Sequence, residues 1–332
     1  MNPYRILSSC TIEFQGQSPV IKLIESADFT IDVKRPQPGW LDAETREKIV
    51  GYHALLAGGE NLNAATMDRA DDILIIARNG VGYDKVDLDY CTECGIIVTN
   101  TPGAMADAVA DQAFALLLGL SRQLVLGDAR VKQGDAYDVP IGEDLTAMTL
   151  GLFGCGHIGA EIIHRALGFK MRVLVHDPWV DGEQIRALGA EPVDRETLLA
   201  ESDAITLHVP LTEANHEMVN GDFLRQMKKG AHLINTARGG LVDEAALIEA
   251  LKDEHLAGAG LECQATEPPQ DQSLELVRLD NVLALPHSGS KTLAARKRMA
   301  MVAAEGIIAR LQGKMPNHVV NKAVLEKLDL AD

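Results

Sequence analysis

The stretch TLGLFGCGHIGAEIIHRALGF, residues 149–169, is the most informative local signal in the sequence. An apolar run typical of a strand leads into Gly154, Gly156 and Gly159, and an apolar run typical of a helix follows. The pattern G-x-G-x-x-G carries little weight alone, but between a strand and a helix it is typical of a turn that holds a pyrophosphate. The first glycine permits a tight turn, the second lets the backbone approach the phosphates, and the third allows close packing of helix on strand. We therefore predict a unit that binds a dinucleotide at the helix N-terminus.

An acidic residue follows this turn at the spacing that a ribose requires. Asp177 ends the next apolar run, residues 172–177, and lies 23 positions after Gly154. A carboxylate about 20 residues after the turn accepts hydrogen bonds from the ribose 2′-hydroxyl and repels a 2′-phosphate. The sequence therefore indicates NAD rather than NADP, with His157 and Ile158 of the turn as further cofactor contacts. The alternative is that the glycines serve only to pack the helix on the strand.

Short aliphatic runs alternate with helical patterns through most of the chain. Most runs are continuously apolar, which is typical of parallel strands covered on both faces. We expect strands at residues 4–8, 53–57, 73–77, 95–100, 149–154, 172–177, 204–209, 232–237, 257–262 and 282–286. Repeated units of this kind predict an α/β fold with doubly wound parallel sheets.

The order of the segments indicates two lobes. A long apolar helix is expected at residues 106–122, between the first group of strands and the second. Residues 123–148 show no strong strand pattern and are expected to form a connection or an arm. A helical pattern at residues 291–314 follows the last strand and could return to the first lobe. A chain of 332 residues is also more naturally two domains than one.

The composition excludes several classes of function. The chain holds 31 Lys and Arg residues against 48 Asp and Glu residues, a formal charge of −17. Binding to nucleic acid or to an anionic membrane is not expected, because both require a basic surface. No apolar run reaches the length of a membrane span and no signal peptide is visible, so we expect a cytoplasmic protein.

The five cysteines point to neither disulfides nor a metal. They are scattered and odd in number, which is typical of reduced thiols in the cytoplasm. The CTEC stretch at residues 91–94 has the spacing of a metal site, but no second pair accompanies it. We therefore expect no bound metal.

Three later strands each lead to an ionisable side chain: Arg238, Glu267 and His287. In doubly wound sheets, ligands lie beyond the carboxyl ends of the strands, so the three side chains could converge on a bound nicotinamide. They suit hydride transfer coupled to proton transfer. A histidine serves as acid or base near neutral pH, and a carboxylate beside it fixes its tautomer. An arginine fork can hold a substrate carboxylate and polarise its carbonyl group.

Each of these residues also has an ordinary structural interpretation. Arg238 could cap a helix or form an ion pair, Glu267 could be a solvated loop acid, and His287 could be a structural histidine at a strand end. His208 and His176 are rival histidines, and we interpret both as structural.

Several motifs in order resemble the D-isomer-specific 2-hydroxyacid dehydrogenases. After the glycine turn come HDP (176–178), LHVPLTEAN (207–215), NTARGG (235–240) and PHSGS (286–290). The stretch RNGVGYDKVDLDYCTECGIIVTNTPG, residues 78–103, also resembles the substrate lobe of that family. The likeness runs from about residue 50 to the end and is weakest at residues 1–50 and 123–148.

The resemblance implies an NAD-dependent transfer of hydride between nicotinamide and C2 of a small D-2-hydroxy acid or 2-oxo acid. It implies that Arg238, Glu267 and His287 form the catalytic set, with His287 as the acid and base. The backbone N–H groups of Val81 and Gly82 would bind the substrate carboxylate, together with Arg238 and His287. The cofactor contacts that it implies are Pro210, Thr236, Ala237, Arg238, Glu262, His287 and Gly289.

The resemblance also implies the domain plan. A Rossmann NAD-binding domain, residues 105–288, would be inserted in a flavodoxin-like substrate domain formed by residues 1–104 and 289–332. The family is usually dimeric, so we expect a homodimer with the 106–148 region in the contact.

The sequence departs from the family at two places. Glu262-Cys263-Gln264 replaces the usual Asp-Val-Phe, so Glu262 stands where an aspartate is expected to contact the carboxamide. Residues 55–66 hold no Arg or Lys, although relatives that oxidise phosphoglycerate often have a cation there. This weakens a phosphorylated substrate without excluding one.

Two other functions stay open at this point. The chain could be a binding protein that senses NAD(H) with little turnover, as corepressors of this shape do. It could also keep the fold and oxidise a formate-like or phosphite-like donor, although the NGVG turn makes that less attractive. The intact Arg, Glu and His set favours an enzyme.

Overall fold

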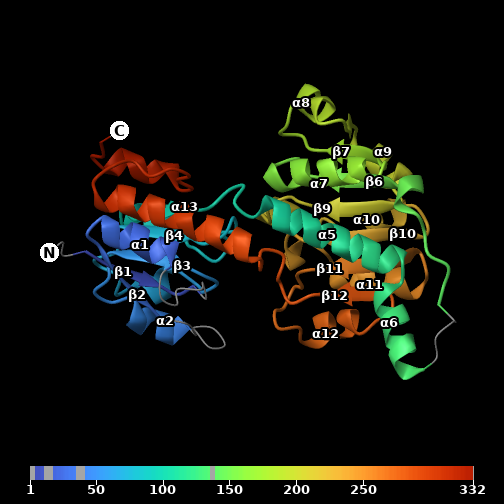
Figure 1. The fold of residues 1–332 in the computed structure, drawn as a ribbon, viewed down its shortest axis with the longest axis horizontal. Coiled ribbons are helices and arrows are strands. Elements are labelled where there is room, and N and C mark those ends of the chain that lie inside the picture. The colour runs from blue at the N-terminus through green and yellow to red at the C-terminus, as the bar shows by residue number, and fades with distance from the viewer. Residues whose placement is uncertain (1–3, 11–17, 35–41, 135–138, 332) are drawn as a thin grey trace. The chain divides into compact units, whose positions relative to one another are not determined.

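The computed structural model describes residues 4–10, 18–34, 42–134 and 139–331. The chain divides into two compact units (Figure 1). The first unit comprises Met1–Met105 and Lys291–Asp332, and the second unit comprises Ala106–Ser290. The second unit is thus inserted, in sequence, between two parts of the first.

The first unit is built on a five-stranded parallel sheet in the order β2-β1-β3-β4-β5. Its strands are β1 (Arg5–Ser8), β2 (Thr30–Val33), β3 (Ala54–Ala57), β4 (Ile75–Arg78) and β5 (Ile97–Thr99). Successive side chains of these strands enter different cores: Ile6, Leu56 and Ile75 lie in one, and Leu7, Leu55 and Ile76 lie in the other. The continuous apolar runs reflect this burial on both faces.

Helices cover both faces of the first sheet. On one face α1 (Pro19–Ser26) lies beside α13 (Leu293–Leu311), which packs on β3 and β4 (Figure 1). The C-terminal helix therefore returns to the N-terminal sheet. The other helical elements of the unit are α2 (Asp42–Lys48), α3 (Ala64–Met67), α4 (Leu88–Glu93) and the 3-10 helix η4 (Lys322–Lys327).

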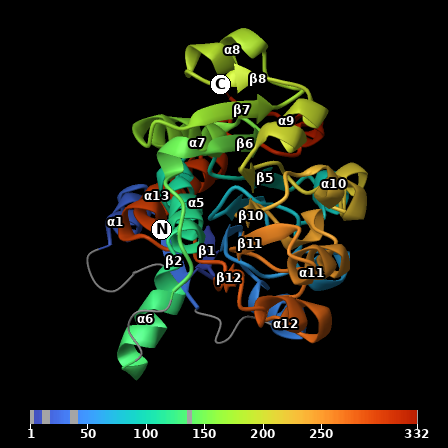
Figure 2. The same ribbon diagram turned by 90° about the vertical axis from the view of Figure 1, so that its right-hand side faces the viewer.

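The second unit holds a seven-stranded parallel sheet in the order β12-β11-β10-β9-β6-β7-β8. Its strands are β6 (Thr149–Phe153), β7 (Arg172–His176), β8 (Glu191–Pro192), β9 (Ala204–Leu207), β10 (Ala231–Asn235), β11 (Leu256–Leu261) and β12 (Val282–Ala284). Figure 2 shows α5 (Ala106–Ser121) and α7 (His157–Gly168) on one face, and α9 (Arg195–Glu201), α10 (Gly221–Gln226) and α11 (Glu244–Lys252) on the other. Its further helical elements are α6 (Leu124–Gln133), α8 (Gly182–Ala187), α12 (Asp271–Val277), η1 (Leu145–Ala147), η2 (Glu213–Asn215) and η3 (Gly239–Leu241).

The strand order confirms the predicted α/β class with two doubly wound parallel sheets. The first sheet has the flavodoxin-like order and the second has the order of a dinucleotide-binding fold. In the second sheet, successive strands proceed from β6 to β8 on one side and from β9 to β12 on the other. The loops after β6 and β9 therefore diverge at a topological switch point, where such sheets bind ligands.

The structure adds elements that the sequence did not indicate. Strand β2 has exposed and half-buried residues in alternation, and β8 has only two residues, so neither presents an apolar run. Residues 124–133, expected as a connection, form helix α6, which has no buried residue.

The length and hydropathy of the helices bear on membrane insertion. In the described ranges no single helix is long and apolar enough to cross a bilayer, although α5 and α6, bent by 58° at their junction, pass the length and composition test as a pair.

Candidate active site

The predicted site residues of the second unit all follow neighbouring parallel strands. They are Gly154–Gly159 after β6, Asp177 after β7, Pro210 after β9, Thr236–Arg238 after β10, Glu262 and Glu267 after β11, and His287 and Gly289 after β12. Because the strands are parallel, these loops leave the sheet at the same edge. Segments more than 100 residues apart in the sequence therefore border one edge.

The protein's own packing requires two of the three glycines in the turn. Gly154 has a φ of +92°, and a Cβ there would lie 2.7 Å from the carbonyl oxygen of His208. A Cβ on Gly159 would lie 2.4 Å from the carbonyl oxygen of Gly154. Gly156 differs, because a Cβ there would meet no atom within 4 Å. The position beside the middle glycine is therefore empty. This is expected of a residue that lets phosphates approach the backbone.

Helix α7 begins with open hydrogen-bond donors. Gly156 is its N-cap and supplies no side-chain cap. Among the described residues, the backbone N–H groups of Gly156, His157 and Ile158 have no hydrogen-bond partner. Free N–H groups and the helix dipole attract an anion at this point. The turn therefore fits the pyrophosphate of a dinucleotide.

Asp177 links the end of β7 to the glycine turn. Its Oδ2 accepts a hydrogen bond from the Cys155 N–H at 2.7 Å, and its Oδ1 accepts one from the Trp179 N–H at 2.9 Å. A carboxylate offers about four lone-pair sites, so both oxygens can still accept a ribose hydroxyl. The residue is half-buried beside the turn, where its charge would oppose a 2′-phosphate.

Glu262 has a buried carboxylate oxygen that lacks a hydrogen-bond donor within the described ranges. The residue is 2% exposed, and its Oε1 accepts hydrogen bonds from the N–H groups of Ser288 and Gly289. Its Oε2 is buried and has no partner among the described residues. A buried acceptor without a donor is costly, so the site fits a group that donates N–H bonds. The carboxamide of nicotinamide is such a group, and the longer side chain of glutamate can therefore stand in the aspartate position.

His287 and Glu267 form a direct pair. The Nδ1 of His287 lies 2.9 Å from Oε2 and 3.1 Å from Oε1 of Glu267. Since the carboxylate can only accept, Nδ1 carries the proton and Nε2 is left to face a substrate. The two side chains are 49% and 37% exposed, so the imidazole is accessible.

The backbone of His287 is held in an unusual conformation. Its φ is +48°, in the left-handed region that a residue with a Cβ seldom adopts. Its N–H donates to the carbonyl oxygen of Glu262 at 3.0 Å. Strained backbone of this kind clusters at functional sites, where the surrounding structure maintains it.

Arg238 lies in a loop that is pressed against the segment carrying Glu267. A Cβ on Gly239 would lie 2.1 Å from the backbone of Gln264, so only glycine permits this approach. Asn235, at the end of β10, fixes the loop from within: its Oδ1 accepts from the Ala237 N–H at 3.0 Å, and its Nδ2 donates to the Arg238 carbonyl at 2.8 Å.

The charges of Arg238 and Glu267 both affect a buried thiol. Burial raises the pKa of Cys263, and the charge of Glu267 raises it further, whereas the charge of Arg238 lowers it. Both charges therefore act on one sulfur atom. The contact between Glu267 and His287 and the close approach of Gly239 to Gln264 bring together the segments that carry the three predicted catalytic residues.

Two residues that support the site were not indicated by the sequence. Asn235 is fully buried. Glu244, at the start of α11, accepts from the Ala265 N–H at 2.9 Å and from Ser273 Oγ at 2.6 Å. It thereby holds the loop that carries Glu267. Two features of the sequence could have indicated these residues: an amide side chain at the end of a buried strand, and an acidic residue in the first turn of a helix.

The rival histidines His208 and His176 have structural partners. Desolvation lowers the pKa of His208 to about 3, and its Nε2 lies 2.8 Å from Thr206 Oγ1. His176 Nδ1 lies 3.2 Å from the carbonyl oxygen of Val193. His157 differs from both, because it is exposed at the first position of α7.

The predicted substrate turn lies in the first unit. Asn100 Nδ2 donates to the Val81 carbonyl at 2.9 Å, and Arg78 Nε donates to the Gly82 carbonyl at 3.2 Å. These bonds fix both peptide groups through their oxygens. The N–H groups of Val81 and Gly82 have no partner within the described part of the chain. Two adjacent free N–H groups in a fixed turn can bind a carboxylate.

The CTEC stretch lies on and just after α4. Cys91 is buried and Cys94 is exposed. Over the described ranges, no three or more His, Cys, Asp or Glu side chains are grouped to hold a metal ion.

Comparison with known proteins places these features in a family. Residues 114–289 match the family model described as D-isomer specific 2-hydroxyacid dehydrogenase, NAD binding domain. The chain is 41% identical to the glyoxylate reductase of Thermococcus litoralis over 316 residues, which cover 92% of this chain and 94% of that protein.

Solved structures agree with this match. The TT0316 protein of Thermus thermophilus superposes with a TM-score of 0.85 at 38% identity, over 95% of this chain and 99% of that one. The D-lactate dehydrogenase of Aquifex aeolicus, solved with NAD and lactic acid, gives a TM-score of 0.82 at 27% identity, over 98% of each chain.

Proposed function

The chain belongs to the D-isomer-specific 2-hydroxyacid dehydrogenase family and is an NAD-dependent oxidoreductase of 2-oxo and 2-hydroxy acids. We propose that Arg238, Glu267 and His287 carry the reaction, with His287 as the acid and base. The observation that supports this most strongly is the contact between His287 Nδ1 and the Glu267 carboxylate at 2.9 Å. It leaves Nε2 as the nitrogen that exchanges a proton with the substrate.

The proposed roles follow from the chemistry of each group. In reduction, Nε2 of His287 donates a proton to the substrate carbonyl oxygen, and in oxidation it removes the hydroxyl proton. Glu267 orients the ring and stabilises the imidazolium. Arg238 holds the substrate carboxylate with its fork and polarises the carbonyl. When bound, NAD supplies the hydride donor or acceptor for C2.

The cofactor is held by residues of the second unit in this proposal. The N–H groups at the start of α7 bind the pyrophosphate, and Asp177 binds the ribose 2′-hydroxyl. Glu262 accepts from the carboxamide, while Pro210, Thr236, Ala237 and Gly289 complete the cofactor contacts. Residues 105–288 are thereby assigned to the NAD-binding domain.

Residues 1–104 and 289–332 are assigned to the substrate domain. The free N–H groups of Val81 and Gly82 bind the substrate carboxylate, which is an anion of the right size for two adjacent donors. Since the glyoxylate reductase of Thermococcus litoralis is 41% identical, a small 2-oxo acid such as glyoxylate is the substrate that we propose.

The test is a steady-state assay of NADH oxidation with the purified full chain. Glyoxylate, pyruvate, hydroxypyruvate, oxaloacetate and phosphohydroxypyruvate form the panel, and NADH binding is measured separately by nicotinamide fluorescence. Oxidation with at least one small 2-oxo acid is expected. NADH binding without oxidation by any of them would instead support the NAD(H)-sensing alternative.

We also propose a homodimer in the cytoplasm. Helix α6 exposes Leu124, Val125 and Val131 by 56%, 60% and 62%, and such apolar exposure on one helix suits a partner surface. Light scattering should give twice the chain mass, and Val125→Glu combined with Val131→Glu should shift the protein toward the monomer. All five cysteines are free thiols, which suits a reducing compartment.

A further inference from the structure

Three buried polar atoms at one edge of the first sheet have no hydrogen-bond partner among the described residues. They are Glu60 Oε2, Asn79 Oδ1 and Thr101 Oγ1. Glu60 follows β3, Asn79 follows β4 and Thr101 follows β5. Buried polar atoms are nearly always satisfied, so three unmet atoms at the same edge require an explanation.

The strand register places these atoms beside the proposed carboxylate turn. Ala57 pairs with Arg78, and Ala77 pairs with Thr99, so the loops after β3, β4 and β5 leave the sheet at one level. The Asn79 N–H donates to the Ala57 carbonyl at 2.9 Å, and the Thr101 N–H donates to the Gly80 carbonyl at 3.1 Å. The turn with Val81 and Gly82 is therefore flanked by the loops that carry the unmet atoms.

Glu60 is the charged member of this group, and one of its oxygens is already committed. The residue is 5% exposed, and its Oε1 accepts from Ser9 Oγ at 2.5 Å and from the Gly58 N–H at 3.2 Å. These contacts fix the carboxylate and leave Oε2 as the unmet acceptor. A carboxylate oxygen is a strong acceptor, so a donor placed beside it would form a charge-assisted hydrogen bond.

Gly58 lies close to that oxygen. A Cβ on Gly58 would lie 3.2 Å from Glu60 Oε2, and the next atom it would meet is Ser9 Oγ at 3.4 Å. A side chain at position 58 would therefore crowd the Glu60 carboxylate. Gly58 does not have a left-handed φ, so its conformation alone does not require a glycine.

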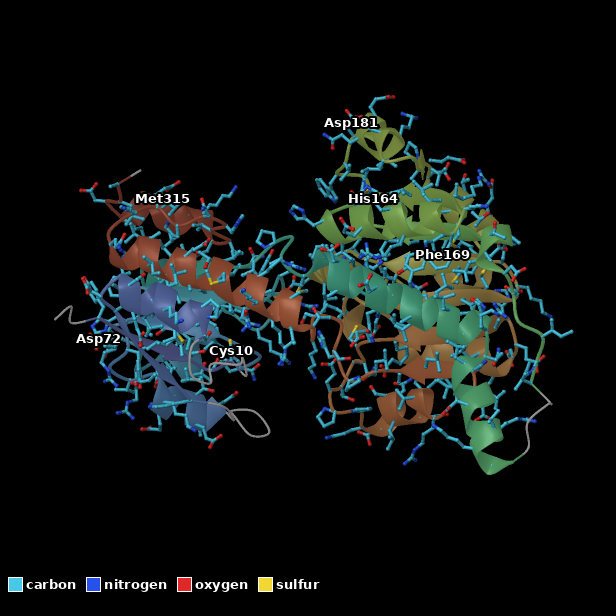
Figure 3. All side chains as sticks on the ribbon, viewed as in Figure 1. Cys10, Asp72, His164, Phe169, Asp181 and Met315 are labelled. Carbon is cyan, nitrogen blue, oxygen red and sulfur yellow. The ribbon has the colours of Figure 1, made fainter. Side chains whose placement is uncertain are left out.

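The charges around Glu60 can be located through a neighbouring thiol. Cys10, labelled in Figure 3, lies two residues after β1. Burial raises the pKa of Cys10, the charge of Glu60 raises it further, and the charge of Arg78 lowers it. The Nε of Arg78 donates to the Gly82 carbonyl, so this guanidinium supports the carboxylate turn. Glu60 and Arg78 therefore both lie near Cys10, next to the carboxylate turn.

We propose that Glu60 is a specificity residue that recognises a hydroxyl group on C3 of the substrate. This inference rests on the proposed function, because it takes the substrate carboxylate to lie at Val81 and Gly82. A hydroxymethyl group donates to Glu60 Oε2, and Asn79 Oδ1 and Thr101 Oγ1 offer further acceptors nearby. A methyl group leaves these atoms unmet, and a carboxylate or phosphate brings a second negative charge to a buried acid.

The test compares kcat/KM for four substrates in the full-length enzyme. Hydroxypyruvate carries the hydroxyl group, pyruvate carries a methyl group, phosphohydroxypyruvate carries a phosphate, and glyoxylate has no C3. The wild type should prefer hydroxypyruvate to pyruvate by about tenfold or more, the value of a hydrogen bond to a charged group. Phosphohydroxypyruvate should be the poorest substrate.

Two variants test the residue itself. Glu60→Gln should bring the ratio of hydroxypyruvate to pyruvate close to one and improve phosphohydroxypyruvate, while glyoxylate turnover is retained. Gly58→Ala places a methyl group against Oε2 and should lower kcat/KM for hydroxypyruvate about tenfold with little change for glyoxylate. Glu93→Gln, at an exposed residue that ends α4, is the matched control and should change none of these ratios.

The outcomes separate this inference from the proposed function. If the wild type turns over none of the four substrates, the proposed function fails. If glyoxylate is turned over but pyruvate serves as well as hydroxypyruvate in the wild type, the role of Glu60 is overturned. An unchanged ratio in a folded Glu60→Gln protein overturns it as well. Should Glu60→Gln fail to fold, the wild-type ratio and Gly58→Ala still decide the question.

Discussion

His287 Nδ1 lies 2.9 Å from Glu267 Oε2, although 20 residues separate the two in the sequence. The register of the sheet explains the contact, because Leu261 at the end of β11 pairs with Ala284 at the end of β12. His287 comes just beyond β12 and Glu267 beyond β11, so adjacent parallel strands deliver both side chains to one edge. The two adjacent strands thereby hold the imidazole and the carboxylate in contact, and a fixed geometry of this kind lowers the entropic cost of the reaction.

Replacing His287 should remove turnover and spare cofactor binding. His287→Gln keeps a polar side chain but cannot exchange a proton at neutral pH, so kcat should fall by about 100-fold or more. NADH affinity, measured by fluorescence, should change little. His318→Gln is the matched control, since His318 is also exposed and has a φ of +59°. A His287→Gln enzyme with wild-type kcat on every accepted substrate would refute the assignment.

Arg238→Lys should impair the enzyme even though it keeps the positive charge. A lysine offers a point charge in place of the planar fork that holds a carboxylate with two bonds. We expect kcat/KM to fall by about tenfold or more, because each charge-assisted bond contributes on the order of 1.5–3 kcal/mol. Arg225→Lys on α10, where the arginine is 72% exposed, should have no effect. Unchanged kcat and KM in Arg238→Lys would exclude the proposed role.

The sequence predicted the edge that carries the site because the strands have continuous apolar runs and polar residues mark their ends. Gly154, Asp177, Arg238 and His287 could be found in this way. Strand β2 and helix α6 were missed because neither buries a residue, so neither shows an apolar pattern.

The supporting residues could not be predicted for a different reason. Asn235, Glu244 and Glu60 hydrogen-bond to backbone groups or side chains. These partners either lie far away in the sequence or come within reach only when the loop has folded. Ser9 and Glu60 are 51 residues apart, and Ala265 and Glu244 are 21 apart. Local sequence patterns do not indicate such contacts, so only the structure reveals them.

The glycine turn allows the roles of packing and of cofactor binding to be separated. Gly159→Ala places a methyl group 2.4 Å from a backbone oxygen, so it should lower the Tm by several degrees. Gly156→Ala meets no atom within 4 Å, so its Tm should match the wild type. It should nonetheless raise the Kd for NADH about tenfold or more, because the methyl group occupies the space of the pyrophosphate. Wild-type NADH affinity in Gly156→Ala would contradict the proposed binding turn.

Asp177→Asn should relax the preference for NAD over NADP. The asparagine Oδ1 can still accept one of the two backbone bonds, while the charge that repels a 2′-phosphate is lost. The ratio of kcat/KM with NADH to that with NADPH should fall about tenfold or more. Asp181→Asn, at the N-cap of α8 and labelled in Figure 3, removes a nearby charge as a control. If the two variants shift the ratio equally, Asp177 is not the discriminating residue.

His208 should make the protein less stable as the pH falls from 7 to 5. Desolvation lowers its pKa to about 3 in the folded protein, whereas an unfolded chain has a histidine pKa of about 6.5. Below that value the unfolded state binds the proton and the folded state does not, so the stability is complete above pH 6.5 and decreases toward pH 3. Between pH 7 and pH 5 the loss in the free energy of unfolding is about 1–2 kcal/mol.

His208→Gln keeps a hydrogen-bonding side chain beside Thr206 and cannot titrate, so its Tm should rise relative to wild type on acidification. His164→Gln, on the exposed side of α7 (Figure 3), should follow the wild type, and parallel Tm curves for His208→Gln and wild type would show that His208 is protonated in the folded protein.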